Sequence, residues 1–308
     1  IDDFAVEWKW DGIRVQLAAR GGLTKLFSRT GDDIGHSFPE LCAPEGVDAV
    51  LDGELLIMRD GEVQPFAALQ QRLNRKSVTR ALMARHPAHL RLYDALEIAG
   101  EDLRGLSFEE RRARLEAWHR DHAPPFTDLS ERLRFADKAG LRAAWEQTRA
   151  AAIEGLMLKR RSSPYLAGRP KGHWFKWKRA ALTADCVLLY AQKGAGKRAS
   201  FYSDYTFGAW SGPEGAPVLV PVGKAYSGFT DRELAELDRF IRANTVERYG
   251  PVRAVAPKLV LEVAFDAIQP SARHKSGIAM RFPRIARIRW DKPAEEADRL
   301  ETLKAMIG

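Results

Sequence analysis

The first 60 residues of the 308-residue chain form short apolar or alternating runs separated by turn residues, a pattern that restricts this part to β-strands. Strands are predicted at 4–10, 13–19, 23–28 and 50–58. Gly21-Gly22 separates the second run from the third, and two such residues are typical of a tight hairpin turn. Antiparallel pairing is therefore expected near the N-terminus.

The next 120 residues mix helices with strands. The predicted elements are helices at 66–73, at 77–85, from Ser107 and from near Asp137, and strands at 90–97, 155–159 and 174–178. Glu110 follows Ser107 by three residues, which is the spacing of a capping box at a helix start. This first part is therefore expected to be α+β.

The pattern changes after Arg179. Strands are predicted at 182–192, 200–210, 218–225, 260–268 and 285–290, with one helix from Thr230 to about Glu247 and a last helix at 294–306. Strands interrupted by one helix favour a small β-barrel of the oligonucleotide-binding type. We therefore predict two domains, residues 1–180 and 181–308.

Composition excludes several classes of protein. With 8 Trp, 7 Tyr and 14 Phe, the chain has too much apolar surface for a disordered protein. No apolar run reaches the ~18–20 residues of a membrane span, and no signal peptide is recognisable. Cys42 and Cys186 are too few for a disulfide framework, so we expect buried, reduced thiols and a cytoplasmic protein.

Positive charge is concentrated in two segments. The net charge is +8, yet residues 159–179 hold eight basic residues and no acid, and residues 273–292 hold seven basic residues and one acid. Two solvated basic faces would explain this distribution. Phosphate binding is the more specific interpretation, and it predicts a polyanionic partner.

The most informative segment is residues 7–14, with the sequence EWKWDGIR. On a strand, Glu7 and Lys9 share a face, because residues two apart point the same way. A lysine among aromatic residues is unusual unless it is paired or functional. The alternatives are a half-exposed Lys9 with its stem over tryptophan, or a salt bridge between Glu7 and Lys9.

Further short motifs follow in order along the chain. They contain Arg29, Glu54, Tyr93, Glu154, the pair Lys176 and Lys178, and the group Arg289, Asp291 and Lys292. From residue 7 to about 298 this set resembles the covalent nucleotidyltransferases, and among them the catalytic core of ATP-dependent DNA ligases of a bacterial multi-domain type. The resemblance implies an adenylation domain, ATP-grasp-like, with antiparallel sheets and helices, followed by an OB-fold domain.

The resemblance also implies roles for the residues that bind ATP. Lys9 matches the lysine that forms a covalent bond to AMP. A lysine amine must lose its proton to attack, and nearby cations would favour that loss. Glu7 matches the contact to the adenine 6-amino group, which a carboxylate accepts while rejecting the 6-oxygen of guanine. Arg14 and Arg29 match the residues that hold the ribose and the phosphates, and Tyr93 matches the aromatic ring that stacks on adenine, although it could be a core residue.

The remaining matches are to residues that bind metal ions or phosphate groups. Glu54 matches a ribose and metal contact, and Glu154 matches a metal-binding carboxylate, so Mg²⁺ or Mn²⁺ is expected. Lys176 and Lys178 match the lysines that touch the α-phosphate; two cations on one strand face repel unless an anion lies between them.

Arg289, Asp291 and Lys292 match residues that act on pyrophosphate. The residues expected on DNA phosphates are Arg169, Lys171, Arg281 and Arg284. Pro170 stands where many relatives have a basic residue.

The implied function is sealing of nicks with 5′-phosphate and 3′-hydroxyl ends in double-stranded DNA, with ATP and a lysyl-AMP intermediate. The alternatives are an RNA ligase, a capping-type nucleotidyltransferase and a nucleic-acid-binding module that has lost catalysis. The chain is expected to be monomeric. Because it begins with Ile1, we expect a piece of a longer protein that has an N-terminal DNA-binding domain.

Overall fold

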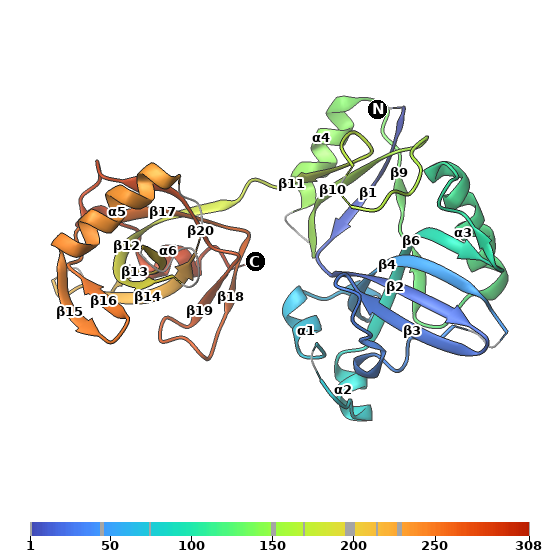
Figure 1. Ribbon diagram of the computed structural model, residues 1–308, viewed down its shortest axis with the longest axis horizontal. Coiled ribbons are helices and arrows are strands. Elements are labelled where there is room, and N and C mark those ends of the chain that lie inside the picture. Colours follow the sequence, from blue (N-terminus) through green and yellow to red (C-terminus); the bar gives the residue numbers. More distant parts are fainter. Residues whose placement is uncertain are drawn as a thin grey trace. The chain divides into compact units, whose positions relative to one another are not determined.

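The computed structural model describes residues 2–43, 46–73, 75–148, 152–168, 170–194, 201–213, 215–226 and 230–307. The chain divides into two compact units (Figure 1). Unit 1 is Ile1–Arg179 and unit 2 is Ala180–Gly308, so the division lies one residue before the predicted boundary.

The larger sheet of unit 1 carries most of that unit's core. Its strands are β2 (Ile13–Arg20), β3 (Leu23–Ser28), β4 (Ala49–Arg59), β5 (Glu62–Val63), β6 (Ala88–Ile98), β7 (Glu101–Asp102) and β8 (Thr127–Leu129). The order is β3–β2–β4–β6–β7; β5 pairs with β4, and β8 pairs in parallel with β6. The β2–β3 hairpin turns at Gly21 and Gly22 as predicted, and both residues have positive φ.

The smaller sheet of unit 1 has one apolar and one charged face. Its strands are β1 (Phe4–Trp10), β9 (Arg132–Leu133), β10 (Ile153–Arg160) and β11 (Trp174–Lys178), in the antiparallel order β11–β10–β1–β9. On the apolar face, Val6 and Leu156 pack against Leu141 of helix α4 (Lys138–Gln147), which lies across this sheet in Figure 1. The opposite face of the same sheet carries charged side chains, among them Glu7, Lys9 and Lys178.

The longer helices of unit 1 begin at the predicted caps. The remaining helices are α1 (Phe66–Gln70), α2 (Arg80–Arg85), α3 (Phe108–His122) and a 3₁₀ turn at Gly35–Ser37. Ser107 and Glu110 form the complete capping box of α3, and Asp137 accepts a hydrogen bond from the Gly140 N–H at the start of α4. These side chains satisfy N–H groups that have no partner inside the helix. The first turns were therefore predictable from local sequence.

Unit 2 is a curled antiparallel sheet around a core rich in aromatic residues. Its strands are β12 (Leu182–Lys193), β13 (Tyr202–Ser211), β14 (Val218–Ala225), β15 (Thr245–Tyr249), β16 (Val252–Val255), β17 (Val260–Phe265), β18 (Ala267–Pro270), β19 (Ile278–Arg281) and β20 (Arg284–Arg289). The long strand β12 pairs with β13, β16 and β17; β14 pairs with β13, and β20 with β17. Tyr205, Phe207 and Phe265 are fully buried inside.

Several predicted bounds in unit 2 were wrong. The helix that starts at the Thr230–Glu233 capping box is α5 (Asp231–Ala243), and the residues after it turn into the hairpin β15–β16. The last predicted helix is reduced to α6 (Leu300–Lys304), after a 3₁₀ turn at Ala294–Glu296. Pairing of β15 with β16 uses the backbone groups at 245–247 that a longer α5 would have needed for its own hydrogen bonds.

Two expectations from composition have different outcomes. Cys186 is buried as predicted, but Cys42 is exposed, which corrects the expectation of two buried thiols. Across the described ranges, no helix combines the length and the apolar character needed to cross a membrane.

Candidate active site

Lys9 lies on the charged face of the smaller sheet. It is opposite Gly155 of β10, which in turn is opposite Lys178 of β11. The Lys9 amine forms an ion pair with Glu154 Oε2, and the Lys178 amine lies 3.3 Å from the same oxygen. The side chains of Lys9 and Glu154 are 17% and 18% exposed. The predicted nucleophile is thus held among charged groups and not in bulk water.

Two glycines allow this arrangement. A Cβ at Gly155 would lie 2.2 Å from the Trp177 carbonyl oxygen, and Gly155 has φ of +149°. A Cβ at Gly12 would lie 2.4 Å from the Leu55 carbonyl oxygen. Neither position has room for a side chain, so each motif needs its glycine for a close approach of two backbones.

The two predicted metal-binding carboxylates differ in protonation. Burial raises the pKa of Glu54 to about 7; the Lys9 charge opposes this shift, and the Glu154 charge adds to it. Burial acts in the same direction on Glu154, but the charge and hydrogen bond of Lys9 and the charge of Lys178 lower its pKa to about 2. At neutral pH Glu154 is therefore ionised, while Glu54 is divided between its two forms.

These carboxylates fit a hydrated, hard cation. Glu54 and Glu154 are half-buried, and repulsion between their charges adds to the larger effect of burial in raising the pKa of Glu54. A divalent cation would relieve that repulsion, and Mg²⁺ commonly uses only one or two protein carboxylates beside phosphates and water. Among the described residues, no group of three His, Cys, Asp or Glu side chains converges on one point. The donor set thus suits Mg²⁺ or Mn²⁺ shared with a nucleotide.

Glu7 is buried on the same face, and its partner is Lys159 rather than Lys9. The Lys159 amine donates to Glu7 Oε2 at 2.9 Å, and the Ser130 hydroxyl donates to the same oxygen at 2.8 Å. The alternative of a Glu7–Lys9 salt bridge is therefore wrong. Sequence analysis counted Lys159 only as part of a basic segment. Strand alternation was the available signal, because it places residue 159 on the face that carries Glu7.

Tyr93 lies where β6 has a bulge. Asp52 of β4 is opposite Asp94 and Gly53 is opposite Leu92, so Tyr93 is the extra residue between them. A bulge redirects a side chain relative to the regular strand. The Tyr93 ring lies 4.2 Å from the Lys159 amine and thereby joins the Glu7 group.

Arg14 belongs to a second group on the larger sheet. Its guanidinium donates to Asp52 Oδ2 at 2.5 Å and also to the Tyr165 hydroxyl, which itself donates to Asp52 at 3.0 Å. The contacts of Asp52 and Tyr165 with Arg14 were not predicted from the sequence. Asp52 was detectable as a second acid, two residues before Glu54 and on the same strand face.

Other predicted residues are more exposed. Arg29 is exposed in the turn after β3, Lys171 is exposed in the turn before β11, and Lys176 is exposed on β11, on the face of Lys178. Arg169 lies outside the described residues, next to the exposed Pro170. The roles of these residues stay predictions.

In unit 2 the predicted pyrophosphate group gathers around an acid that sequence analysis missed. Asp185 Oδ2 accepts from Arg289 at 3.1 Å and from Lys292 at 2.8 Å. Arg289 also donates to both carboxylate oxygens of Asp291. Asp185 follows an alanine in an apolar strand, 104 residues before Arg289, so its role depends on the pairing of β12 with β17 and of β17 with β20.

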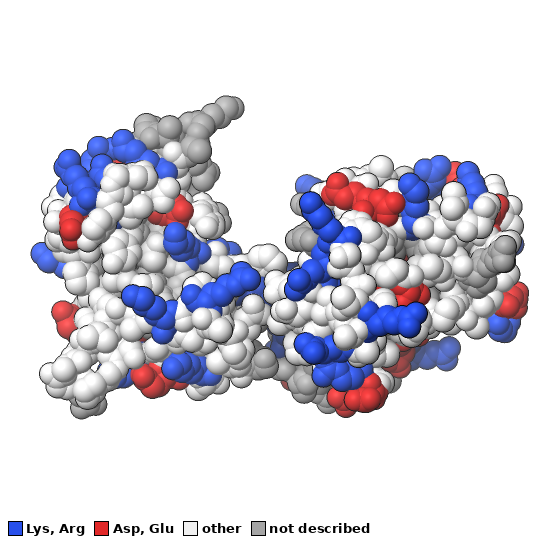
Figure 2. All heavy atoms as spheres, turned by 90° about the horizontal axis from the view of Figure 1, so that it is seen from below, with Lys and Arg blue, Asp and Glu red and all other residues white. Residues whose placement is uncertain are grey.

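The predicted DNA contacts of unit 2 lie near β19 and β20. Arg284 lies 3.3 Å from Asp266, and the Arg281 guanidinium lies 5.1 Å from the ring of the exposed Phe282. Figure 2 shows Lys and Arg side chains spread over the drawn face of each unit, with smaller groups of acidic side chains among them. Exposed positive charge is thus available on both units.

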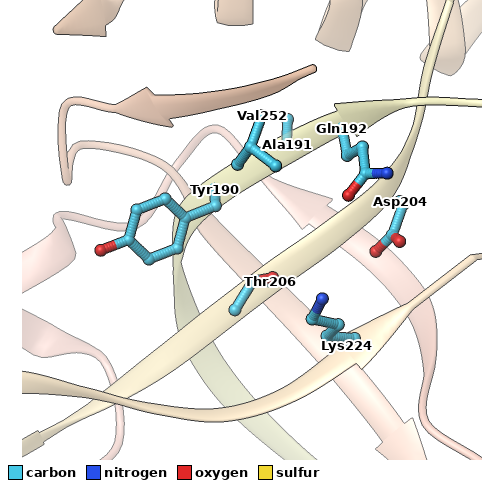
Figure 3. A pocket seen from close by; sticks show the side chains of 7 residues that line it. All are labelled: Tyr190, Ala191, Gln192, Asp204, Thr206, Lys224 and Val252. Atoms are coloured by element: carbon cyan, nitrogen blue, oxygen red, sulfur yellow. The ribbon is translucent and has the colours of Figure 1, made fainter. Parts of the chain in front are cut away.

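Unit 2 also has a shallow pocket that contains none of the predicted residues. It is lined by Tyr190, Ala191, Gln192, Asp204, Thr206, Lys224 and Val252 (Figure 3). Asp204 is the one acidic residue of this lining, so the pocket offers no pair of metal-binding carboxylates. We therefore assign the chemistry to the charged face of unit 1.

The comparisons with known proteins agree with the sequence motifs. Residues 1–178 match the model described as the ATP dependent DNA ligase domain, and residues 198–292 match the ATP dependent DNA ligase C terminal region. The chain is 40% identical over 320 residues to a protein named probable DNA ligase from Koribacter versatilis. That alignment covers 96% of this chain and 55% of the relative, so the chain spans about half the relative's length.

Two solved structures are similar in fold. One is described as mycobacterial DNA ligase D complexed with ATP and MES; it has a TM-score of 0.51 and 25% identity, covering 97% of this chain and 93% of that chain. The other, from a study of Lig E DNA ligases, has a TM-score of 0.63 and 21% identity, covering 93% of each chain. The predicted α+β fold with an OB-fold second domain is confirmed.

Proposed function

Because this chain belongs to the family of ATP-dependent DNA ligases, we propose that it seals nicks in double-stranded DNA through a lysyl-AMP intermediate on Lys9. The observation that carries the proposal is the position of the Lys9 amine beside Glu154 and Lys178. A structural lysine would need one counter-ion, whereas this one shares its counter-ion with a second cation. An anion bound at this face would separate and balance the charges.

In the first step, the Lys9 ammonium leaves Glu154, loses its proton to solvent water and attacks the α-phosphorus of ATP as the neutral amine. A P–N bond forms, the bond to the oxygen that bridges to the β-phosphate breaks, and pyrophosphate leaves. Lys178 and Lys176 neutralise charge on the α-phosphate, which is the main contribution a protein makes to phosphoryl transfer. A 5′-phosphate oxygen of the nick then attacks the phosphorus of the lysine-bound AMP, which breaks the P–N bond and restores the Lys9 amine. The 3′-hydroxyl attacks the 5′-phosphorus, loses its proton and releases AMP.

Glu54 and Glu154 are the residues that would hold Mg²⁺ or Mn²⁺, which would neutralise phosphate charge during transfer. Glu7 and Tyr93 would bind the adenine, while Arg14 and Arg29 would bind the ribose and the phosphates. The Asp52 and Tyr165 contacts of Arg14 support this role, because they fix the direction of its guanidinium.

Unit 2 would act in the first step through Arg289, Asp291 and Lys292, and a hinge at 179–183 would let it approach and leave. Two features support a hinge there. Residues 179–181 belong to no strand, and Arg179 remains tied to unit 1 through bonds to the carbonyl oxygens of Ile153 and Glu154. DNA phosphates would be bound by Lys171, Arg281, Arg284 and Arg169, in a monomer of the nucleoid that has a further N-terminal domain for DNA binding.

The test is a pair of assays on the same preparation. Incubation with labelled ATP and Mg²⁺ is expected to transfer AMP to the chain, and later addition of a nicked DNA duplex is expected to remove the label and seal the strand. Sealing should weaken steeply with salt, because phosphate contacts release counterions. Labelling by GTP in place of ATP, or transfer only to nicked RNA, would favour the capping enzyme or the RNA ligase instead.

A further inference from the structure

Lys159 is the most completely enclosed lysine near the site. Its side chain is 2% exposed. The amine bonds to Glu7 on one side, and the rings of Tyr93, Trp174 and Phe108 lie 4.2, 4.6 and 5.0 Å away. An ammonium group over aromatic faces is stabilised by their negative electrostatic potential. The same ammonium thus connects Glu7 with Tyr93, the two residues expected to contact the base.

This arrangement keeps a buried ion pair together. Burial lowers the pKa of Lys159, whereas the charge and hydrogen bond of Glu7 and the charge of Asp94 raise it; Arg112 on α3 lowers it again. A buried charge is tolerated only with a close, well-oriented partner. The aromatic cage and Glu7 meet that need for Lys159, and Lys159 meets it for Glu7.

Glu7 has one oxygen left over. Lys159 and Ser130 both bind Oε2, whereas Oε1 is buried and has no hydrogen-bond partner among the described residues. Arg112 Nη1 lies 3.7 Å from Oε1, which is an ion pair but too long for a hydrogen bond. A carboxylate oxygen accepts hydrogen bonds, so Oε1 can accept one from a bound ligand.

We propose that Lys159 is a positioning residue for base recognition, which fixes the Glu7 carboxylate through Oε2 and leaves Oε1 to accept from the amino group of a 6-aminopurine. This inference rests on the proposed function, in which ATP binds at this face. A 6-oxopurine places an acceptor against Oε1 and is rejected, since a polar group left without a partner in a buried site is costly.

Removal of the lysine should change this selectivity. In Lys159→Met, Glu7 keeps the Ser130 hydrogen bond and the Arg112 ion pair at 3.7 Å, but it loses the amine that fixes Oε2. The carboxylate can then rotate, so that Oε1 is no longer held in one direction. The variant should then admit ITP, which differs from ATP by a 6-oxygen in place of the 6-amino group.

The experiment measures kcat/KM for lysyl-AMP and lysyl-IMP formation by the whole chain, from pH 6 to pH 9. The wild type is expected to prefer ATP over ITP by a ratio that changes little with pH. In Lys159→Met the ratio should fall by about tenfold or more at every pH in this range. Lys159→Arg keeps a cationic donor and should retain more of the preference for ATP than Lys159→Met, and the exposed Lys138→Met is the matched control.

The outcomes separate the two proposals. If the wild type forms no adduct or does not prefer ATP, the proposed function fails. If the wild type behaves as expected but folded Lys159→Met keeps the same ratio at every pH, only the role of Lys159 is wrong. If Lys159→Met does not fold, Phe108→Leu decides: it keeps the lysine and removes one wall of the cage, and an unchanged ATP/ITP ratio in that folded variant overturns the inference.

Discussion

The two units hold their functional charges in different ways. In unit 1, Lys9 and Lys178 share Glu154 in a half-buried setting, and the nearby Glu54 has a pKa raised to about 7 by burial and by the Glu154 charge. In unit 2, Arg289 is paired with both Asp185 and the exposed Asp291.

In unit 1, Lys9 and Lys178 share one carboxylate, and the charges of Glu54 and Glu154 repel each other; a bound nucleotide and cation would relieve both effects. In unit 2, Arg289 and Lys292 already have carboxylate partners. The unit 1 site is therefore the one that gains more from binding a ligand. To act on pyrophosphate, Arg289 and Lys292 would have to give up bonds that they make within unit 2. We therefore expect substitutions in unit 1 to have large effects on the first step, and those in unit 2 to have smaller, step-specific effects.

Lys9→Ala should have the largest effect. Without the amine no phosphoramide can form, so the AMP adduct should fall below detection, a loss of at least about 1,000-fold. Gel labelling with ATP and Mg²⁺ measures it, and Lys138→Ala on the exposed start of α4 is the control. An adduct of normal yield in Lys9→Ala would show that another residue is the nucleophile.

Glu154→Gln should come next. The substitution keeps the size of the side chain but removes the counter-ion of Lys9 and one carboxylate of the proposed cation site. The rate of adduct formation should drop by roughly 100-fold, in line with the loss of an electrostatic catalytic group. Glu146→Gln, an exposed residue of α4, should stay near the wild type. Equal rates in the two variants would mean that Glu154 is structural.

Arg289→Ala should show a moderate effect that depends on the step. Adduct formation should fall by about tenfold or more, while sealing of a nick that already carries AMP should change little, because pyrophosphate is involved only in the first reaction. Rapid-quench assays with the two substrates compare the steps. An equal loss in both would contradict the proposed role of unit 2.

The last prediction concerns stability, where the expected effect is the smallest: besides slowing adduct formation by removing a proposed cation ligand, Glu54→Gln should change the melting temperature in a pH-dependent way. The folded state holds the Glu54 proton more tightly than the unfolded state, whose glutamate has an ordinary pKa, so this residue costs stability as pH rises from about 4.5 to about 7. In metal-free buffer, the variant should melt roughly 2–6 °C above the wild type at pH 8 and lose that advantage by pH 4.5.

Thermal melts at several pH values measure this difference. Glu62→Gln on the exposed β5 is the control and should parallel the wild type. A Glu54→Gln advantage that is the same at pH 4.5 and pH 8 would contradict the raised pKa.

Local patterns were sufficient for much of the fold. The caps at Ser107 and Thr230 were predictable because cap chemistry involves residues three apart. The hairpin β15–β16 was missed although Asn244, the C-cap of α5, is a residue that commonly ends helices. The pairing of β16 with β12, more than 50 residues earlier in sequence, could not be read locally. Tertiary contacts override local preference at such places.

The site was predictable where alternation along a strand fixed a face, as for Lys9 and Lys178. Lys159 and Asp185 were not assigned roles, because a charged residue in sequence suggests solvent exposure unless its partners are known. Their partners come from other strands and from α3, so only the folded chain reveals the cage around Lys159 and the cluster around Asp185.

The most direct test of the central claim is peptide mapping by tandem mass spectrometry after incubation of the wild-type chain with ATP and Mg²⁺. The account predicts one added AMP, bound to the Lys9 side chain in the peptide that contains the sequence EWKWDGIR. An AMP found on another residue, or no adduct on a folded and fully metallated chain, would contradict it.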